Sequence, residues 1–226
     1  MNYSLIIPIY NEEKTLHELL FQLEKYSNIF EIIIINDGST DGTKHILEKN
    51  NSFKIFHLPN NIGKGYSLIT GVNYAKNDNI ILMDGDLEIE LSCIKNLIKN
   101  FELSKGHVVI GNRWIIKYQN KKDLNTLGNH LLNQIFNLLF GTQLEDILCC
   151  AKIINKKLFT SLNLKSERFS IEAEMMSKLA FKEIKISEVA VPYKRRTNSQ
   201  GKKLKISDGW SIIFIMLKIR IKGIYN

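Results

Sequence analysis

The stretch EIIIINDGSTDGT, residues 31–43, indicates the class of fold by itself. Its four consecutive isoleucines, Ile32–Ile35, are typical of a strand that is buried on both faces of a parallel sheet. The Asn36–Ser39 segment predicts a tight turn, and Asp41 is placed to cap a helix that ends near Lys49. A buried strand, a polar turn and a helix in immediate succession predict an α/β fold.

The same alternation continues on both sides of this stretch. Asn11 is placed to cap a helix whose first turn carries Glu12 and Glu13. Strands are expected at 4–9, 53–58, 79–83 and 107–110, and helices at 63–76 and 90–101. The short strand–helix connections predict a mostly parallel sheet covered by helices on both faces.

Polar clusters follow four successive strands at the point where each strand ends. They are Tyr10–Glu12, Asp37–Ser39, Asp84–Asp86 and Gly111–Arg113. Ligands of such sheets bind beyond the carboxyl ends of the strands, which all lie at one edge. The four clusters are therefore expected to converge on one ligand site.

The second half of the chain is less regular and is expected to complete the same domain. Helices are expected at 124–140, 170–181 and 208–225, strands at 150–154 and 184–194, and a polar loop at 197–203. No internal repeat or low-complexity tract divides the chain, so residues 1–226 are predicted to form a single domain.

The composition excludes several classes of protein. Of the 226 residues, 44% are apolar and 24% are charged, which excludes a disordered chain and a disulfide scaffold. The three cysteines fit a reducing compartment, and no apolar run approaches the roughly 20 residues of a membrane span. The N-terminus lacks the pattern of a secretory signal. The sequence therefore predicts a cytoplasmic protein, with peripheral contact to the inner face of the cell membrane left open.

The net charge of +8 is concentrated at one end of the chain. Residues 194–226 hold nine lysines and arginines and one acid, whereas the rest of the chain is balanced. Such a local patch implies an anionic partner: a phosphate, an acidic lipid or a nucleic acid. No RNA-binding signature accompanies the patch, so nucleic acid is not the expected partner.

The C-terminal helix combines apolar and basic residues. Its apolar positions at helical spacing are Trp210, Phe214, Leu217, Ile221 and Ile224, and its bases are Lys218, Arg220 and Lys222. One interpretation is an interfacial helix on an anionic leaflet. The other is a helix docked on the protein's own core with a solvated basic end, and the sequence leaves both open.

Asp84, Asp86 and Glu88 place three carboxylates within five residues, directly after an apolar strand. A divalent cation relieves the repulsion between such groups, and Mg²⁺ and Mn²⁺ prefer carboxylates together with phosphate oxygens. Gly63-Lys64-Gly65 could bring backbone and an ammonium group near a phosphate, although the spacing of a Walker-type loop is absent.

Four motifs in this order resemble those of the family-2 glycosyltransferases, most nearly the dolichyl-phosphate mannose synthase and polyprenyl-phosphate glycosyltransferase group. They are Ile6–Glu13, Asn36–Thr43, Asn61–Gly65 and Met83–Glu88. The resemblance implies a GT-A fold with a Rossmann-like sheet, a nucleotide-sugar donor and a divalent metal. Residues 1–113 would bind the nucleotide sugar, 114–205 the acceptor, and 206–226 would form an amphipathic helix. Asn36 and Gly85 depart from the residues common in the group.

The resemblance also implies roles for single residues. The nucleotide sugar would be held by Pro8, Tyr10, Glu12, Asp37, Lys64, Asp84 and Asp86. The metal, Mg²⁺ or Mn²⁺, would be bound by Asp84, Asp86 and Glu88. The acceptor phosphate would be bound by Arg113, Arg196, Lys202 and Lys203, and Asp146 matches an acidic residue of the relatives. The predicted catalytic residues are Asp86, Arg113 and Arg196, together with Glu172. Glu172 does not come from the resemblance: it is the slightly favoured of two acids, Glu172 and Glu174, on the helix expected at 170–181.

The function expected from these residues is metal-dependent, inverting transfer of a hexose from a UDP- or GDP-sugar to a polyprenyl phosphate. An acceptor phosphate is already ionised near neutral pH and needs no general base. The alternative is transfer to a sugar hydroxyl in cell-surface polysaccharide synthesis, which needs a base such as Glu172 or Glu174. A non-enzymatic module that binds anions or RNA is a remote alternative.

Overall fold

The computed structural model describes residues 2–104, 108–116, 124–196 and 206–224. The loop expected at 197–203, with Lys202 and Lys203, lies outside these residues.

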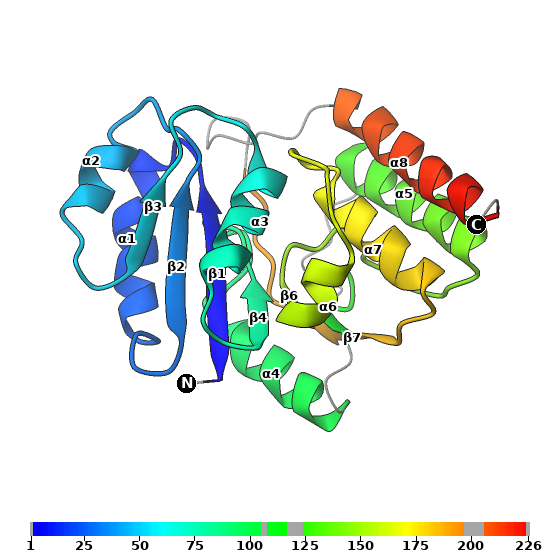
Figure 1. The fold of residues 1–226 in the computed structure, drawn as a ribbon, viewed down its shortest axis with the longest axis horizontal. Coiled ribbons are helices and arrows are strands. Elements are labelled where there is room, and N and C mark those ends of the chain that lie inside the picture. The colour runs from blue at the N-terminus through cyan, green and yellow to red at the C-terminus, as the bar shows by residue number, and fades with distance from the viewer. Residues whose placement is uncertain (1, 105–107, 117–123, 197–205, 225–226) are drawn as a thin grey trace.

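Seven described strands form one sheet in the order β3-β2-β1-β4-β6-β5-β7 (Figure 1). They are β1 (Tyr3–Ile9), β2 (Glu31–Asn36), β3 (Lys54–His57), β4 (Asn79–Leu82), β5 (Val108–Asn112), β6 (Lys152–Asn155) and β7 (Ile186–Ala190). Only β6 runs antiparallel to its neighbours β4 and β5 among these described strands, and their other pairings are parallel. The expected mostly parallel α/β sheet is confirmed.

The helices cover both faces of this sheet. They are α1 (Glu13–Glu24), α2 (Thr43–Glu48), α3 (Lys64–Tyr74), α4 (Ile94–Leu103), α5 (Leu124–Phe140), α6 (Lys156–Ser161), α7 (Ile171–Phe181) and α8 (Ile206–Ile224), with a short 3₁₀ helix η1 (Leu91–Cys93). One core lies under α1, α2 and α4, and the other lies under α3, α5, α6, α7 and α8. Ile32 and Ile34 enter the first core and Ile33 and Ile35 the second, so β2 is buried on both faces as expected.

The two expected helix caps have different outcomes. Asn11 does not cap α1, which begins at Glu13 after Glu12. Asn11 has a positive φ of 50°, and its Oδ1 accepts a hydrogen bond from the amide of Thr40 at 2.8 Å, which ties the first polar cluster to the second. Asp41 lies one residue before the N-cap of α2, which is Gly42, but it accepts from the amide of Thr43, the first residue of α2, at 3.0 Å.

The second half of the chain departs most from expectation. β6 begins at Lys152 rather than at residue 150 and inserts between β4 and β5. Helix α6, which Asn155 caps by accepting from the amides of Lys157 and Leu158, was not expected. β7 ends at Ala190, and Tyr193 then forms an isolated antiparallel bridge with Ile89. The long strand expected at 184–194 is therefore wrong in its C-terminal part, because the chain leaves the sheet and crosses to the loop that follows β4.

Helix α8 packs against α5 and α7 in an outer layer (Figure 1). Ile212 and Met216 face the core, so part of the helix is docked on the protein. Within the described residues, no helix combines the length and the apolar character that crossing a membrane demands.

Candidate active site

The polar clusters that follow β1, β2 and β4 meet at one edge of the sheet, as expected. The amide of Asn11 donates to Oγ of Ser39 at 2.9 Å, which joins the first two clusters. Lys64, at the start of α3, reaches the third cluster through Asp84. Arg113, at the end of the fourth cluster, contacts the ring of Tyr193. Tyr193 in turn bridges to Ile89, just after the acidic residues that follow β4.

Asp37 binds the loop that precedes α3. Its carboxylate accepts from the amides of Ile62 and Gly63 at 3.0 and 2.9 Å, and from Nδ2 of Asn61 at 3.1 Å. Burial raises the pKa of Asp37, and these N–H groups offset only part of that rise. The positive φ of 63° at Gly38 lets the chain pass close to Asn60, where a Cβ would lie 2.3 Å from a backbone carbon. The carboxylate of Asp37 thus fixes the position of the loop that precedes α3.

Lys64 joins three elements at the centre of the edge. Its Nζ lies 2.7 Å from Oδ1 of Asp84, after β4, and 2.5 Å from Oε1 of Glu172, on α7. Burial alone would lower the pKa of Lys64, but the two carboxylates outweigh it and hold that pKa well above its usual value. The ammonium group is therefore a fixed positive charge between two acids.

The glycines on either side of Lys64 allow the chain to pass close to the backbone of another loop. A Cβ on Gly65 would lie 2.0 Å from the carbonyl oxygen of Ser166, and one on Gly63 would lie 2.4 Å from that of Glu167. The amide of Tyr66 also donates to the Glu167 carbonyl at 3.1 Å. The close approach that requires glycine is thus to the 166–168 loop, which covers the start of α3.

Glu172, which was slightly favoured as the functional acid, and Glu174 have different surroundings. Glu172 turns toward the site and pairs with Lys64. Glu174 accepts from the amides of Lys165 and Ser166 at 3.0 and 2.7 Å and pairs with Lys178 at 2.6 Å. Despite burial, these partners hold the pKa of Glu174 below its usual value. Glu174 therefore holds the loop before α7 in place.

The acidic segment after β4 concentrates negative charge. Burial, followed by the charges of Asp84 and Glu88, raises the pKa of Asp86 to about 7. Oδ1 of Asp86 accepts from the amide of Glu88 at 3.0 Å. Across the described ranges, no group of three His, Cys, Asp or Glu side chains converges as metal ligands. Gly85 lies where a Cβ would come within 2.9 Å of Ile9, so the core beneath the loop explains this glycine.

The segment that follows β7, residues 193–196, crosses this acidic loop; we call it the strap. The amide of Lys194 donates to the carbonyl of Glu88 at 2.7 Å, and the amide of Arg196 donates to Oε1 of Glu88 at 2.8 Å. The guanidinium of Arg196 binds Oε2 of Glu12 at 2.7 Å and Oγ1 of Thr15 at 3.0 Å. Arg196 thus lies between the first and third polar clusters, which both contribute to the predicted ligand site.

Arg113 lies in a cage of its own. Its Nε and Nη2 donate to the two oxygens of Asp146 at 2.8 and 2.7 Å, and its amide donates to the same carboxylate at 2.9 Å. The guanidinium carbon lies 5.0 and 5.3 Å from the ring centres of Trp114 and Tyr193. Burial opposes the charge, but Asp146 more than compensates and holds the pKa of Arg113 well above its usual value. The fork uses two of the five side-chain N–H groups, and the other three have no acceptor within the residues that the structure describes.

Residues 4–162 match the family model described as glycosyl transferase family 2. The chain belongs to this family. The resemblance seen in the motifs is therefore confirmed, and the protein is a nucleotide-sugar glycosyltransferase.

Curated relatives of this glycosyltransferase include enzymes named for polyprenyl-linked acceptors. A dolichyl-phosphate beta-glucosyltransferase of Trichomonas vaginalis, ALG5D, is 27% identical over 96% of this chain and 72% of the relative. The glycosyltransferase AglJ of Haloferax volcanii is 28% identical over 96% of this chain and 71% of the relative. The dodecaprenyl-phosphate galacturonate synthase of Rhizobium johnstonii is 25% identical over 97% and 66%, respectively.

Solved structures establish the fold as GT-A. Glucosyl-3-phosphoglycerate synthase from Mycobacterium tuberculosis, in a complex with Mn²⁺, UDP-glucose and phosphoglyceric acid, superposes with a TM-score of 0.75. The two sequences are 17% identical over 97% of this chain and 79% of that chain. The expected fold class is confirmed.

In this glycosyltransferase, most of the predicted site residues lie at the carboxyl edge of the sheet. Pro8 and Tyr10 lie at the end of β1 and are partly exposed. Three neighbours were not singled out from the sequence: Thr15, Trp114 and Glu188. Trp114 adjoins Arg113 in the chain, which is a usable signal, whereas Thr15 and Glu188 reach the site only through folding.

Proposed function

We propose that this glycosyltransferase moves a hexose from a UDP- or GDP-sugar to a polyprenyl phosphate at a membrane surface, with inversion at the anomeric carbon. The observation that carries the proposal is the cage around Arg113. Asp146 fixes this guanidinium, and its other three N–H groups have no acceptor among the described residues, which suits the tetrahedral oxygens of a phosphate. The names of the curated relatives support the same acceptor class.

The acids of α7 favour a phosphate acceptor over a sugar hydroxyl. Attack by a hydroxyl needs a general base that is free to take a proton. Glu172 is paired with Lys64, and Glu174 is bound to Lys178 and two backbone amides. An acceptor phosphate is already charged and needs neither residue.

The acidic segment carries the carboxylates that would bind a divalent cation, although three of them do not converge as ligands in the described residues. Within the described residues Asp86 accepts one hydrogen bond, and its pKa is raised first by burial and then by the negative charges of Asp84 and Glu88. Asp86, flanked by Asp84 and Glu88, would hold Mg²⁺ or Mn²⁺. The cation would neutralise charge on the departing nucleoside diphosphate. The Mn²⁺ in the complex of the mycobacterial synthase supports this assignment.

The roles of the chain's own residues follow from this arrangement. The nucleoside would lie at the ends of β1 and β2. The residues at that place are Pro8, Tyr10, Glu12 and Asp37. Lys64 provides a fixed positive charge beside Asp84. Arg113 and Arg196 would orient the acceptor phosphate for one in-line displacement, which inverts the anomeric carbon. To bind the acceptor phosphate, the guanidinium of Arg196 must release the carboxylate of Glu12.

Helix α8 offers a surface for membrane contact. Trp210, Phe214, Leu217 and Ile221 are exposed and lie three or four residues apart, so they form one apolar stripe. At about 3.6 residues per turn, Lys218 and Arg220 fall on opposite sides of this stripe. An exposed apolar stripe between basic residues matches the surface of an anionic bilayer.

The test supplies radiolabelled UDP- and GDP-hexoses, with Mn²⁺, to the purified protein. One set of reactions contains undecaprenyl phosphate in vesicles, and the other contains oligosaccharides. We expect label in the lipid phosphate alone. Label in the oligosaccharides alone would favour the hydroxyl acceptor, and a failure to bind any nucleotide sugar would contradict both.

A further inference from the structure

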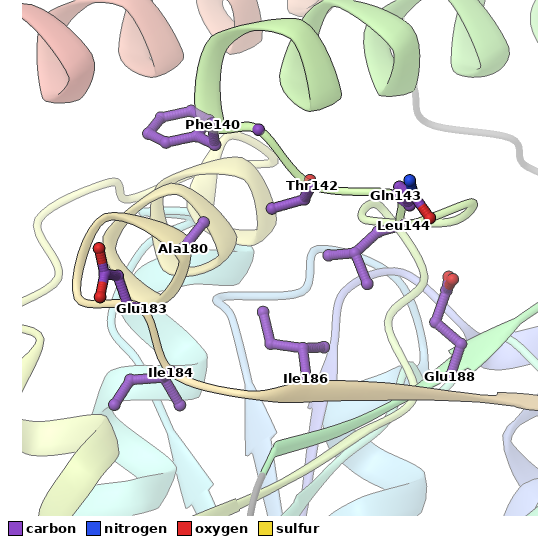
Figure 2. A pocket seen from close by; sticks show the side chains of 10 residues that line it. Phe140, Thr142, Gln143, Leu144, Ala180, Glu183, Ile184, Ile186 and Glu188 are labelled. Carbon is purple, nitrogen blue, oxygen red and sulfur yellow. The ribbon is translucent and has the colours of Figure 1, made fainter.

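Glu188, on the edge strand β7, makes contacts that the proposed function has not used. One oxygen of its carboxylate accepts from the amide of Glu145 at 2.9 Å, and the other accepts from the amide of Asp146 at 2.8 Å. Figure 2 shows Glu188 in line with Ile184 and Ile186, below the loop that carries Gln143 and Leu144. The loop that delivers Asp146 is therefore hydrogen-bonded to β7 through one side chain.

The same loop is tied to the residue before Arg113. Nδ2 of Asn112 donates to Oε2 of Glu145 at 3.0 Å and lies 3.4 Å from Oε1 of Glu188. Asp146 then holds the guanidinium of Arg113 with both oxygens. A continuous chain of hydrogen bonds thus runs from Glu188, through the backbone of Asp146, to Arg113.

A carboxylate at position 188 is needed for this arrangement and is costly to place there. Two neighbouring amides, one to each oxygen, require an acceptor with two oxygens, and a glutamine offers only one. Burial raises the pKa of Glu188, and the acids Asp146 and Glu145 add to the rise. A residue chosen only for packing would avoid this repulsion.

Packing alone does not hold the loop against β7. A groove of about 600 Å³ lies beside Glu188, between the loop, the end of α5 and the end of α7. Its walls include Phe140, Thr142, Leu144, Ala180 and Ile186 (Figure 2). Asn133 and Asn137 of α5 hold the loop at Leu144, and Asn133 also holds it at Ile147, so the two hydrogen bonds to Glu188 fix the amides of Glu145 and Asp146 between these points.

We propose that Glu188 is a positioning residue of the transfer reaction, which acts through Asp146 to set the direction of the Arg113 guanidinium toward the acceptor phosphate. The proposal rests on the proposed function, because it takes Arg113 as the phosphate ligand. It predicts that a change at Glu188 alters acceptor binding and leaves donor binding as it was.

The chain offers a spectroscopic reporter for this test. It has two tryptophans, and Trp210 is 74% exposed on α8, so Trp210→Phe leaves Trp114 as the only tryptophan. Trp114 lies against the Arg113 guanidinium. Its emission and its quenching by acrylamide report on the cage without any need for catalysis.

In this background we expect Glu188→Ala to shift the emission of Trp114 and increase its quenching. The Kd of farnesyl phosphate should rise about tenfold, because a misdirected guanidinium loses part of its charged hydrogen bonding to the phosphate. Glu188→Gln should give an intermediate value, and the UDP-induced rise in melting temperature should not change. The control is Glu183→Gln, which removes an acid from the same groove but none of the bonds to the loop.

A double-mutant cycle distinguishes positioning from a structural role. If Glu188 acts through Asp146, then Glu188→Ala adds nothing to Asp146→Ala in either readout. A lower melting temperature with unchanged Trp114 emission and unchanged farnesyl phosphate affinity would overturn the proposal. If the unaltered protein does not bind farnesyl phosphate, the proposed function fails, while Trp114 still tests the link from Glu188 to the cage.

Discussion

Nη1 of Arg196 lies 2.7 Å from Oε2 of Glu12, and both side chains are almost fully buried. The two residues are separated by most of the chain, and the strap brings them together over the acidic loop. Arg196 is therefore bound to the donor half of the site. An acceptor phosphate must compete with Glu12 for this guanidinium.

Replacing Arg196 should separate acceptor chemistry from donor binding. We expect Arg196→Ala to reduce transfer to a polyprenyl phosphate to background, because an orienting cation is lost. The UDP-induced rise in melting temperature should persist. Lys194→Ala is the control, since Lys194 is exposed and holds Glu88 only through its backbone amide. Equal transfer by Arg196→Ala would remove this residue from the mechanism.

Asp86 should make the stability of the metal-free protein depend on pH. Its pKa is raised from 3.8 to about 7 on folding, so the folded state holds a proton that the unfolded state releases. This contribution to stability is present at low pH and is lost as the pH rises through about 7. The melting temperature should therefore fall relative to Asp86→Asn between about pH 4 and pH 7 and level off above pH 7. The same variant should lose the stabilisation by Mn²⁺, and parallel pH curves would contradict the assignment.

Lys64 should contribute strongly to stability as well as to the site. Removing one partner of a buried ion pair leaves an uncompensated charge, so Lys64→Met should cost about 3 kcal/mol or more in denaturant unfolding. Adding Glu172→Gln to this variant should recover part of the loss. Lys49→Met, at an exposed position, is the control. A neutral effect of Lys64→Met would mean that the two carboxylates have other partners.

The stripe on α8 should bind anionic vesicles. Each basic residue near such a surface contributes roughly 1 kcal/mol, so changing Lys218, Arg220 and Lys222 to glutamine should weaken binding roughly a hundredfold. Trp210→Ser should weaken it through lost apolar contact, whereas Phe21→Ser, at an exposed position on α1, should not. Co-sedimentation with phosphatidylglycerol vesicles measures these effects. Equal binding to neutral vesicles would exclude the electrostatic part.

Part of the site follows from local sequence. The sequence alone predicts three features: the alternation of strands and helices, the polar residues at strand ends and the acidic segment at 84–88. Local patterns suffice here because a parallel β–α unit brings consecutive strand ends to the same edge. The family motifs, which lie within these units, are legible for the same reason.

Other parts depend on contacts that no local pattern records. Glu172 and Glu174 are two residues apart on one helix, and only the tertiary structure shows that the first pairs with Lys64 of α3 and the second with Lys178. The insertion of β6 between β4 and β5 likewise involves residues far apart in the chain.

The sequence by itself determined the fold class, the family and the edge of the sheet where the chemistry lies, because these depend on short-range periodicity and on residues near strand ends. Only the tertiary structure decided the partners of the charged side chains: Arg113 with Asp146, Arg196 with Glu12, and Lys64 with Glu172. The physical reason is that a buried charge is stabilised by whichever opposite charge the fold brings within a few ångströms, at any separation along the chain.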